Sequence, residues 1–161
     1  MNKTRSYRSA LSVVAAALLS LSLASGLRAQ SNGDLLVRVQ AQGSVSQVAG
    51  RLKQAVSQNG LMVMGQLNQG KVLGMTGANV ESQSFFVGNP SLGKKLFAAD
   101  EGVGVVVPVR VNVYRDSQGH TVISYLKPSG ALQAYGSPAL DKMAPMLDKK
   151  LHAIASAAAT S

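Results

Sequence analysis

The chain contains no cysteine and no tryptophan, and its aromatic share is only 4%. Without cysteine it has no disulfide, no catalytic thiolate and no lipid attachment site after a signal sequence. Acidic residues are scarce too, because seven Asp and Glu stand against sixteen Lys and Arg. These scattered acids suggest no pair of inward carboxylates, and the nucleophile elbow Gly-x-Ser-x-Gly does not occur. The composition therefore argues against the common hydrolase classes.

Long hydrophobic runs are also missing. The uncharged run near the start, residues 10–24, has fifteen residues and is diluted by serines, whereas a membrane-spanning helix needs about twenty apolar residues. Three basic residues precede this stretch, and Ala29 follows it at a position suited to signal cleavage, with Ala24-Ser25-Gly26 as a second site. We therefore expect residues 1–29 to be a signal peptide and the mature chain to be periplasmic or secreted, with no membrane span.

Much of the basic charge belongs to this signal. Its removal takes away four basic residues and no acid, which lowers the formal charge from +9 to +5. The remaining basic residues form no stripe interleaved with aromatics, so we expect no nucleic acid partner. About 130 residues remain, which is the size of one domain with one core. Because no disulfide is available, packing must stabilise residues 30–161, with a partner subunit as a further source.

The first half of the mature chain predicts a strand, a helix and a second strand. Residues 35–41 alternate apolar and polar side chains, as in a half-buried strand. Ser44 is a helix cap, and the apolar stripe after it has helical spacing up to the stop signal Asn59-Gly60. That stripe consists of Val45, Val48, Ala49, Leu52, Ala55 and Val56. Residues 61–68 predict a strand with Leu61, Val63 and Leu67 on one face.

The second half predicts a hairpin flanked by helices. Short helices are expected at 69–76 and 91–98, with a strand at 84–87. Residues 102–115 predict one long strand, because the odd-numbered positions from Val103 to Val113 are all valine. Asp116-Ser117-Gln118-Gly119 is expected to form the hairpin loop, and residues 120–127 the return strand. Among the resulting pairs, Arg110 faces Tyr125 and Asn112 faces Ile123.

The last helix carries the buried stripe Leu140, Met143, Leu147, Leu151 and Ile154, and we expect its end, residues 153–161, to fray. Together these elements predict an α+β single domain. Its core element is a mostly antiparallel, twisted sheet of about five strands with helices packed on one face.

One block of sequence resembles a known family. The turn Gly88-Asn89-Pro90, the strand motif in residues 108–113 and the pair Ser124-Tyr125 are similar to those of the domain of unknown function 302 family, and the resemblance covers residues 47–132. It implies a compact α+β domain that is often dimeric and whose biochemical role is not established. Many relatives have an Asp-His pair after the second strand, where this chain has Asn68-Gln69. Any acid-base or metal chemistry of that pair is therefore lost here.

Residues 88–94 satisfy the spacing Gly-x4-Gly-Lys of a phosphate-binding loop. Lys95 stands where that loop needs a hydroxyl for magnesium, and Pro90 lacks an amide, so we exclude nucleotide hydrolysis. A looser prediction is a small anion held at the start of this helix by Ser91, Lys94 and Lys95.

The two histidines, His120 and His152, lack metal-ligand spacing. The methionines could in principle bind Cu(I), but core filling is the common role of this residue. We therefore expect no metal and no cofactor.

The strongest candidate for ligand binding is the open face of the predicted sheet. Arginine and tyrosine anchor carboxylate or polar ligands, yet they are also typical of subunit interfaces, and both readings stay open. The candidate residues are Asn89, Arg110, Asn112, Tyr114 and Tyr125.

We thus expect an exported, non-catalytic binding or accessory module. It would be a homodimer that binds a small anionic or amphipathic ligand. One alternative is a small hydrolase or isomerase that uses His120 with Tyr125 or Lys127. Another is a structural envelope or stress protein that acts through protein contacts.

Overall fold

The alternating and helical patterns of the sequence produce an α+β domain in the computed structural model, which describes residues 35–160. The expected signal peptide lies outside the described residues. The elements follow one another along the chain as β1 (Leu36–Ala41), α1 (Val45–Gln58), β2 (Met62–Leu67), α2 (Gln69–Gly74), β3 (Ser82–Gly88), α3 (Pro90–Ala99), the 3₁₀ helix η1 (Glu101–Val105), β4 (Val109–Arg115), β5 (Thr121–Leu126), α4 (Pro128–Leu132), the 3₁₀ helix η2 (Gln133–Tyr135) and α5 (Pro138–Ala159).

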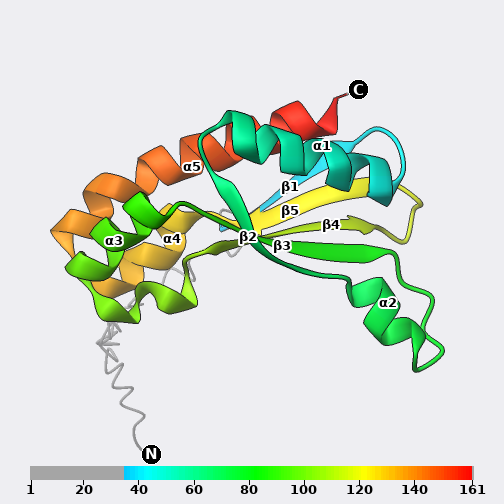
Figure 1. The fold of residues 1–161 in the computed structure, drawn as a ribbon, viewed down its shortest axis with the longest axis horizontal. Coiled ribbons are helices and arrows are strands. Elements are labelled where there is room, and N and C mark those ends of the chain that lie inside the picture. Colours follow the sequence, from blue (N-terminus) through cyan, green and yellow to red (C-terminus); the bar gives the residue numbers. More distant parts are fainter. Residues whose placement is uncertain (1–34, 161) are drawn as a thin grey trace, which may run out of the picture. The chain divides into compact units, whose positions relative to one another are not determined.

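The five strands form one antiparallel sheet in the order β1-β5-β4-β3-β2. Helices α1 and α5 pack against each other and lie on one side of this sheet (Figure 1). We call this side the helix face and the opposite side the open face. The predicted fold class and the single domain are confirmed. Among the described residues, no helix is long and apolar enough to cross a membrane.

Helix α1 begins and ends where the sequence predicts. Ser44 Oγ accepts a hydrogen bond from the Gln47 amide at 3.3 Å, and Gln47 Oε1 accepts one from the Ser44 amide at 2.8 Å. This reciprocal pair satisfies two amides that the first turn would otherwise leave free. Asn59 and Gly60, which has φ of +69°, end the helix. All six residues of the predicted stripe are buried.

The end of α5 does not fray, so that prediction is wrong. The helix continues to Ala159, and Ala155, Ala158 and Ala159 are buried. The Gln42 amide donates to the Ala159 carbonyl at 2.9 Å, and Arg51 Nε donates to the Ala158 carbonyl at 2.9 Å. These bonds give partners to carbonyls that are free at an isolated helix end. Contacts from distant parts of the chain therefore hold the last turn.

The predicted strand at 102–115 is also only partly correct. Its first residues form η1, where Asp100 Oδ1 accepts a hydrogen bond from the Gly102 amide at 2.7 Å. Val103 is fully buried, whereas Val105 is 92% exposed. A cis peptide joins Val107 to Pro108, and β4 begins only at Val109. The alternating valines therefore share one face of a strand only within β4.

The pairing of β4 with β5 is one residue away from the predicted register. The sequence predicts Arg110 opposite Tyr125, but the structure pairs Val111 with Tyr125 and Asn112 with Ser124. The cause lies in the hairpin loop, because the Asp116 amide donates to the His120 carbonyl at 2.9 Å. The loop therefore spans residues 117–119, one fewer than predicted. A shift by one residue moves side chains to the other face.

Tyr125 consequently lies on the helix face. It is opposite Val37 and Val111, and it is only 4% exposed. The residues that line the open face along β4 and β5 are Arg110, Asn112, Tyr114, Val122, Ser124 and Leu126.

Strand β2 carries a second register change. Val63 is opposite Val87, but Gly65 is opposite Phe86, so a bulge lies between Val63 and Gly65. The extra residue reverses the alternation beyond it. Leu67 is opposite Ser84 on the open face and is 44% exposed, whereas the sequence predicts it on the same face as Val63.

The buried phenol of Tyr125 gives a test of the observed register. Burial raises the pKa of Tyr125 above 10.0, and the negative charge of Asp148 adds to this. Because the pKa is higher in the folded state, the stability from the neutral phenol is complete below about pH 10 and is lost as the pH rises through the folded pKa. Between pH 9 and 11.5, the free energy of unfolding should fall more steeply for the wild type than for Tyr125→Phe.

Urea denaturation at stepwise pH measures this difference. Tyr114→Phe, on the open face, is the matched control and should keep the steep alkaline loss of the wild type. If Tyr125→Phe loses stability as steeply as the wild type, Tyr125 is not buried as described.

Candidate functional site

The open face of the sheet is hollowed into a groove of about 710 Å³. Its floor comes from the centre of the sheet, and η1 with the residues after it forms one side. We call this the open-face groove. Side chains along it include Leu36, Phe86, Val105, Arg110, Asn112 and Ser124.

The floor of the groove carries a network of uncharged polar side chains. Ser82 Oγ and Ser84 Oγ donate to Asn112 Oδ1 at 3.0 and 3.2 Å. Gln69, from α2, donates through Nε2 to Ser84 Oγ, and its Oε1 lies 3.4 Å from Ser82 Oγ, where it shares the one hydroxyl proton of Ser82 with Asn112. Ser84 is 1% exposed. Because buried hydroxyls are costly without partners, this network fixes the position of the Asn112 carboxamide.

Arg110 is the cation of the groove. It lies on β4 opposite Phe86 of β3, and its side chain is exposed. Within residues 35–160 its guanidinium makes no hydrogen bond and no ion pair. Apolar residues accompany it in the groove, among them Leu36 and Leu126. An unpaired guanidinium beside apolar side chains can bind an anionic group whose remaining atoms are apolar.

The structure brings together only part of the predicted ligand set. Arg110 and Asn112 both line the groove, and Tyr114 follows them on the same face of β4. Tyr125 is among the residues that border the groove, but its pairing with Val37 and Val111 places its side chain on the helix face. Asn89 is the N-cap of α3 and is not among the residues that line the groove.

The start of α3 uses its amides internally. Asn89 Oδ1 accepts from the amides of Ser91 and Leu92 at 2.9 and 3.1 Å, and the Gly93 amide donates to the Asn89 carbonyl at 2.8 Å. Pro90 has no amide hydrogen. The first turn therefore offers none of these amides to an anion, and Lys94 and Lys95 are exposed side chains beyond it.

His120 directly follows the hairpin loop and contacts Asp116. Its Nδ1 lies 3.4 Å from Asp116 Oδ2, and its amide donates to Asp116 Oδ1 at 2.8 Å. That amide bond, chiefly, holds the pKa of Asp116 below its usual value of 3.8. Tyr125 is five residues further along an extended strand, roughly 17 Å away. His120 therefore shares no site with Tyr125 or with Lys127 beyond it.

Within the described part of the chain, no three His, Asp or Glu side chains are grouped to hold a metal ion. Two residues of this network are not predicted from the sequence: Ser84, which lines the groove, and Ser82, which hydrogen-bonds to Asn112. Their alternation with Phe85 was the available signal, since Phe85 is fully buried on the helix face.

Comparisons with known proteins agree with this fold. Residues 37–158 match the model of the family described as Domain of unknown function DUF302. The chain is also similar to the uncharacterized conserved protein DUF302 from Bacillus stearothermophilus, whose crystal structure aligns with a TM-score of 0.72 and 23% identity. That alignment covers 77% of this chain and 98% of the other. Among curated proteins none matches significantly.

The polar network predicts a measurable energetic coupling. Asn112→Leu removes the acceptor of two buried or nearly buried hydroxyls, so it should lower the free energy of unfolding by about 1–3 kcal/mol. In the double variant Ser84→Ala/Asn112→Leu the cost should be smaller than the sum of the single costs by at least about 0.5 kcal/mol, because one orphaned hydroxyl is also removed.

Urea denaturation of the three variants measures this coupling. Ser124→Ala is the control, since Ser124 faces Asn112 without a side-chain hydrogen bond within the described structure, and it should change stability by less than about 0.5 kcal/mol. Strict additivity of the two single variants would contradict the network.

Proposed function

Because this chain belongs to the DUF302 family, whose description names no activity, we propose a function from its geometry: it is a non-catalytic module that binds a small amphipathic anion in the open-face groove. The observation that carries the proposal is Arg110, exposed in a groove with apolar side chains and without an ion pair among residues 35–160. The proposal includes export of the mature chain after removal of residues 1–29.

The residues of the groove suit a ligand that has one anionic group and one apolar part. The Arg110 guanidinium carries five N–H donors in a planar fork, which matches a carboxylate or a phosphate. Apolar side chains such as Leu36, Phe86 and Val105 suit the hydrocarbon part of the same molecule. The groove volume of about 710 Å³ is within the usual range of about 300–1,000 Å³ for small-molecule sites.

Binding without catalysis is supported by the chemistry of the groove floor. Its network consists of Ser, Asn and Gln side chains, which neither carry charge nor titrate near neutral pH. Gln69 is one of the two residues that replace the Asp-His pair implied for many relatives. None of these floor side chains is therefore suited to act as a general acid or base.

We also propose that the chain is a homodimer. The specific observation in favour is that Met62 and Leu67, on the open face, are 49% and 44% exposed. Large exposed apolar side chains on one face are typical of interaction surfaces. Native mass spectrometry of the mature protein checks this proposal, which a monomer at micromolar concentration would overturn.

Titration with decanoate, a ten-carbon carboxylate, tests the binding function. Isothermal calorimetry should detect saturable binding to the wild type, and Arg110→Gln should weaken it at least tenfold, because a hydrogen bond to a charged group contributes about 1.5–3 kcal/mol. Neutral decanol should bind the wild type and Arg110→Gln alike.

Arg38→Gln is the matched control. Arg38 lies on the same face and is exposed, but it does not line the groove. If Arg38→Gln weakens decanoate as much as Arg110→Gln does, binding reflects net charge rather than this site. No binding to the wild type would reject the proposal.

A further inference from the structure

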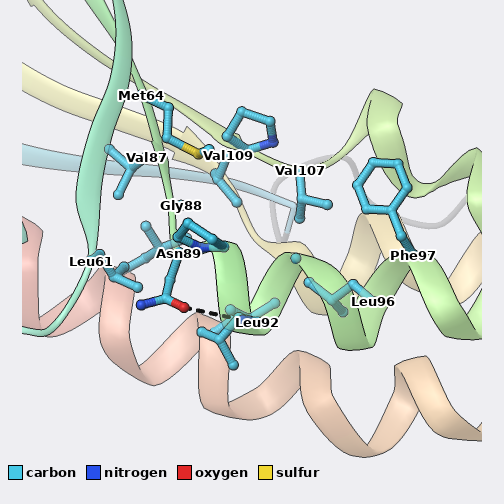
Figure 2. A pocket seen from close by; sticks show the side chains of 15 residues that line it. Leu61, Met64, Val87, Gly88, Asn89, Leu92, Leu96, Phe97, Val107 and Val109 are labelled. Carbon is cyan, nitrogen blue, oxygen red and sulfur yellow. Dashed lines mark hydrogen bonds between the residues drawn. The ribbon is translucent and has the colours of Figure 1, made fainter.

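A second, smaller cavity lies on the helix side of the sheet, next to α3 and α5. Its volume is about 100 Å³, and Figure 2 shows the side chains around it. Apart from Asn89, every residue that lines it is apolar or glycine. The lining includes Leu61, Met64, Leu92, Gly93, Leu96, Phe97, Val107 and Leu151.

The one polar side chain, Asn89, is held by three hydrogen bonds within the protein. Asn89 Oδ1 accepts from the Leu92 amide, as Figure 2 shows, and from the Ser91 amide, and its Nδ2 donates to the Gly60 carbonyl at 3.0 Å. A buried water needs about two to four polar partners. A charged group would need still more, because its desolvation is costly. The cavity therefore favours an uncharged, apolar guest.

One of the lining residues, Gly93, has no side chain. Gly93 lies inside α3, between the lining residues Leu92 and Leu96, and a Cβ added to Gly93 would meet no atom within 4 Å. Glycine inside a helix costs about 0.5–1 kcal/mol relative to alanine. Helix α3 thus has a weak helix former inside it at a position that lines the cavity.

Two large apolar side chains flank the cavity and reach solvent. Met64 is 54% exposed and Phe97 is 43% exposed, and Figure 2 shows Val107 and Val109 between them. The Met64 sulfur can lie close to the backbone of Gly88 because Gly88 has no side chain. A Cβ on Gly88 would lie only 2.8 Å from Met64 Sδ. Sulfur and aromatic rings make favourable contacts with apolar and aromatic guests. The rim is therefore as apolar as the interior.

From these observations we infer that the cavity is a binding site for a neutral apolar molecule, or a neutral apolar end group, of about the size of one six-membered ring. An apolar cavity of about 150 Å³ in another protein stays dry and binds benzene. A cavity of about 100 Å³ with an open, apolar mouth holds such a ring with one edge between Met64 and Phe97. This site is separate from the charged groove, because Arg110 does not line it.

Benzene is the probe for this site. In NMR spectra of the full mature chain with ¹³C-labelled methionine methyls, the Met64 signal should shift saturably as benzene is added, owing to the ring current. Met75 is 79% exposed and does not line the cavity, so its signal should stay in place. Benzoate, which has the same ring and a charge, should shift Met64 at least tenfold less at equal concentration.

Filling the cavity separates this site from non-specific binding. Gly93→Leu should weaken benzene binding at least tenfold, and Gly93→Ala, which adds one methyl, should weaken it by a smaller factor. Gly50→Leu is the matched control: Gly50 is an exposed helical glycine in α1 whose added Cβ also meets nothing within 4 Å, and binding should persist. Arg110→Gln should also leave benzene binding unchanged.

Three results would overturn the inference. One is a Met64 signal that does not shift, or that shifts without reaching a plateau, up to the solubility limit of benzene in the buffer. Another is benzene binding that is equally strong in the wild type, in Gly93→Ala and in Gly93→Leu. The third is equal loss in Gly50→Leu. If Gly93→Leu does not fold, Gly93→Ala and the benzoate comparison still decide the matter.

Discussion

The carboxylate of Asp116 closes the hairpin between β4 and β5, and much of the molecule depends on that closure. Asp116 Oδ1 accepts the amides of Gln118 and His120 at 2.9 and 2.8 Å, which holds the loop at three residues. The loop length sets the register of the two central strands. With this register Tyr125 and Ile123 are buried beneath the helices, while Ser124 joins Asn112 on the open face.

The two faces of the sheet have different chemistry as a result. The helix face is filled by apolar side chains, among them Phe85 and Tyr125, and it holds the small cavity beside α3. The open face carries a fixed polar network with the Arg110 cation beside it. Both spaces are lined by Pro108 and Val109, at the point where the chain leaves η1 and enters the sheet. The start of β4 is therefore common to the two proposed sites.

Because the chain has no cysteine and hence no disulfide, its stability depends on packing and on a few long-range polar contacts. Arg51 joins α1 to the end of α5, and Lys150 Nζ donates to the Asn59 carbonyl at 3.0 Å at the other end of α1. Asn68, the first of the two residues that replace an Asp-His pair, caps α2 by accepting from the Lys71 amide at 2.8 Å. This cap orients the helix that carries Gln69 into the groove floor.

The sequence by itself determined the elements whose signals are local. Helix α1 could be predicted residue by residue, because its capping box, its apolar stripe and its Asn59-Gly60 stop all lie between Ser44 and Gly60. The α+β class and part of the groove, Arg110 and Asn112, also followed from alternation along β4.

Only the tertiary structure decided the rest. The loop length at Asp116 and the bulge in β2 each depend on backbone hydrogen bonds that no alternation pattern encodes. The bonds that hold the end of α5, and the union of Gln69 with Ser82, Ser84 and Asn112, join residues far apart in the chain. The cavity beside Gly93 exists only because α3, α5 and the sheet are brought together there.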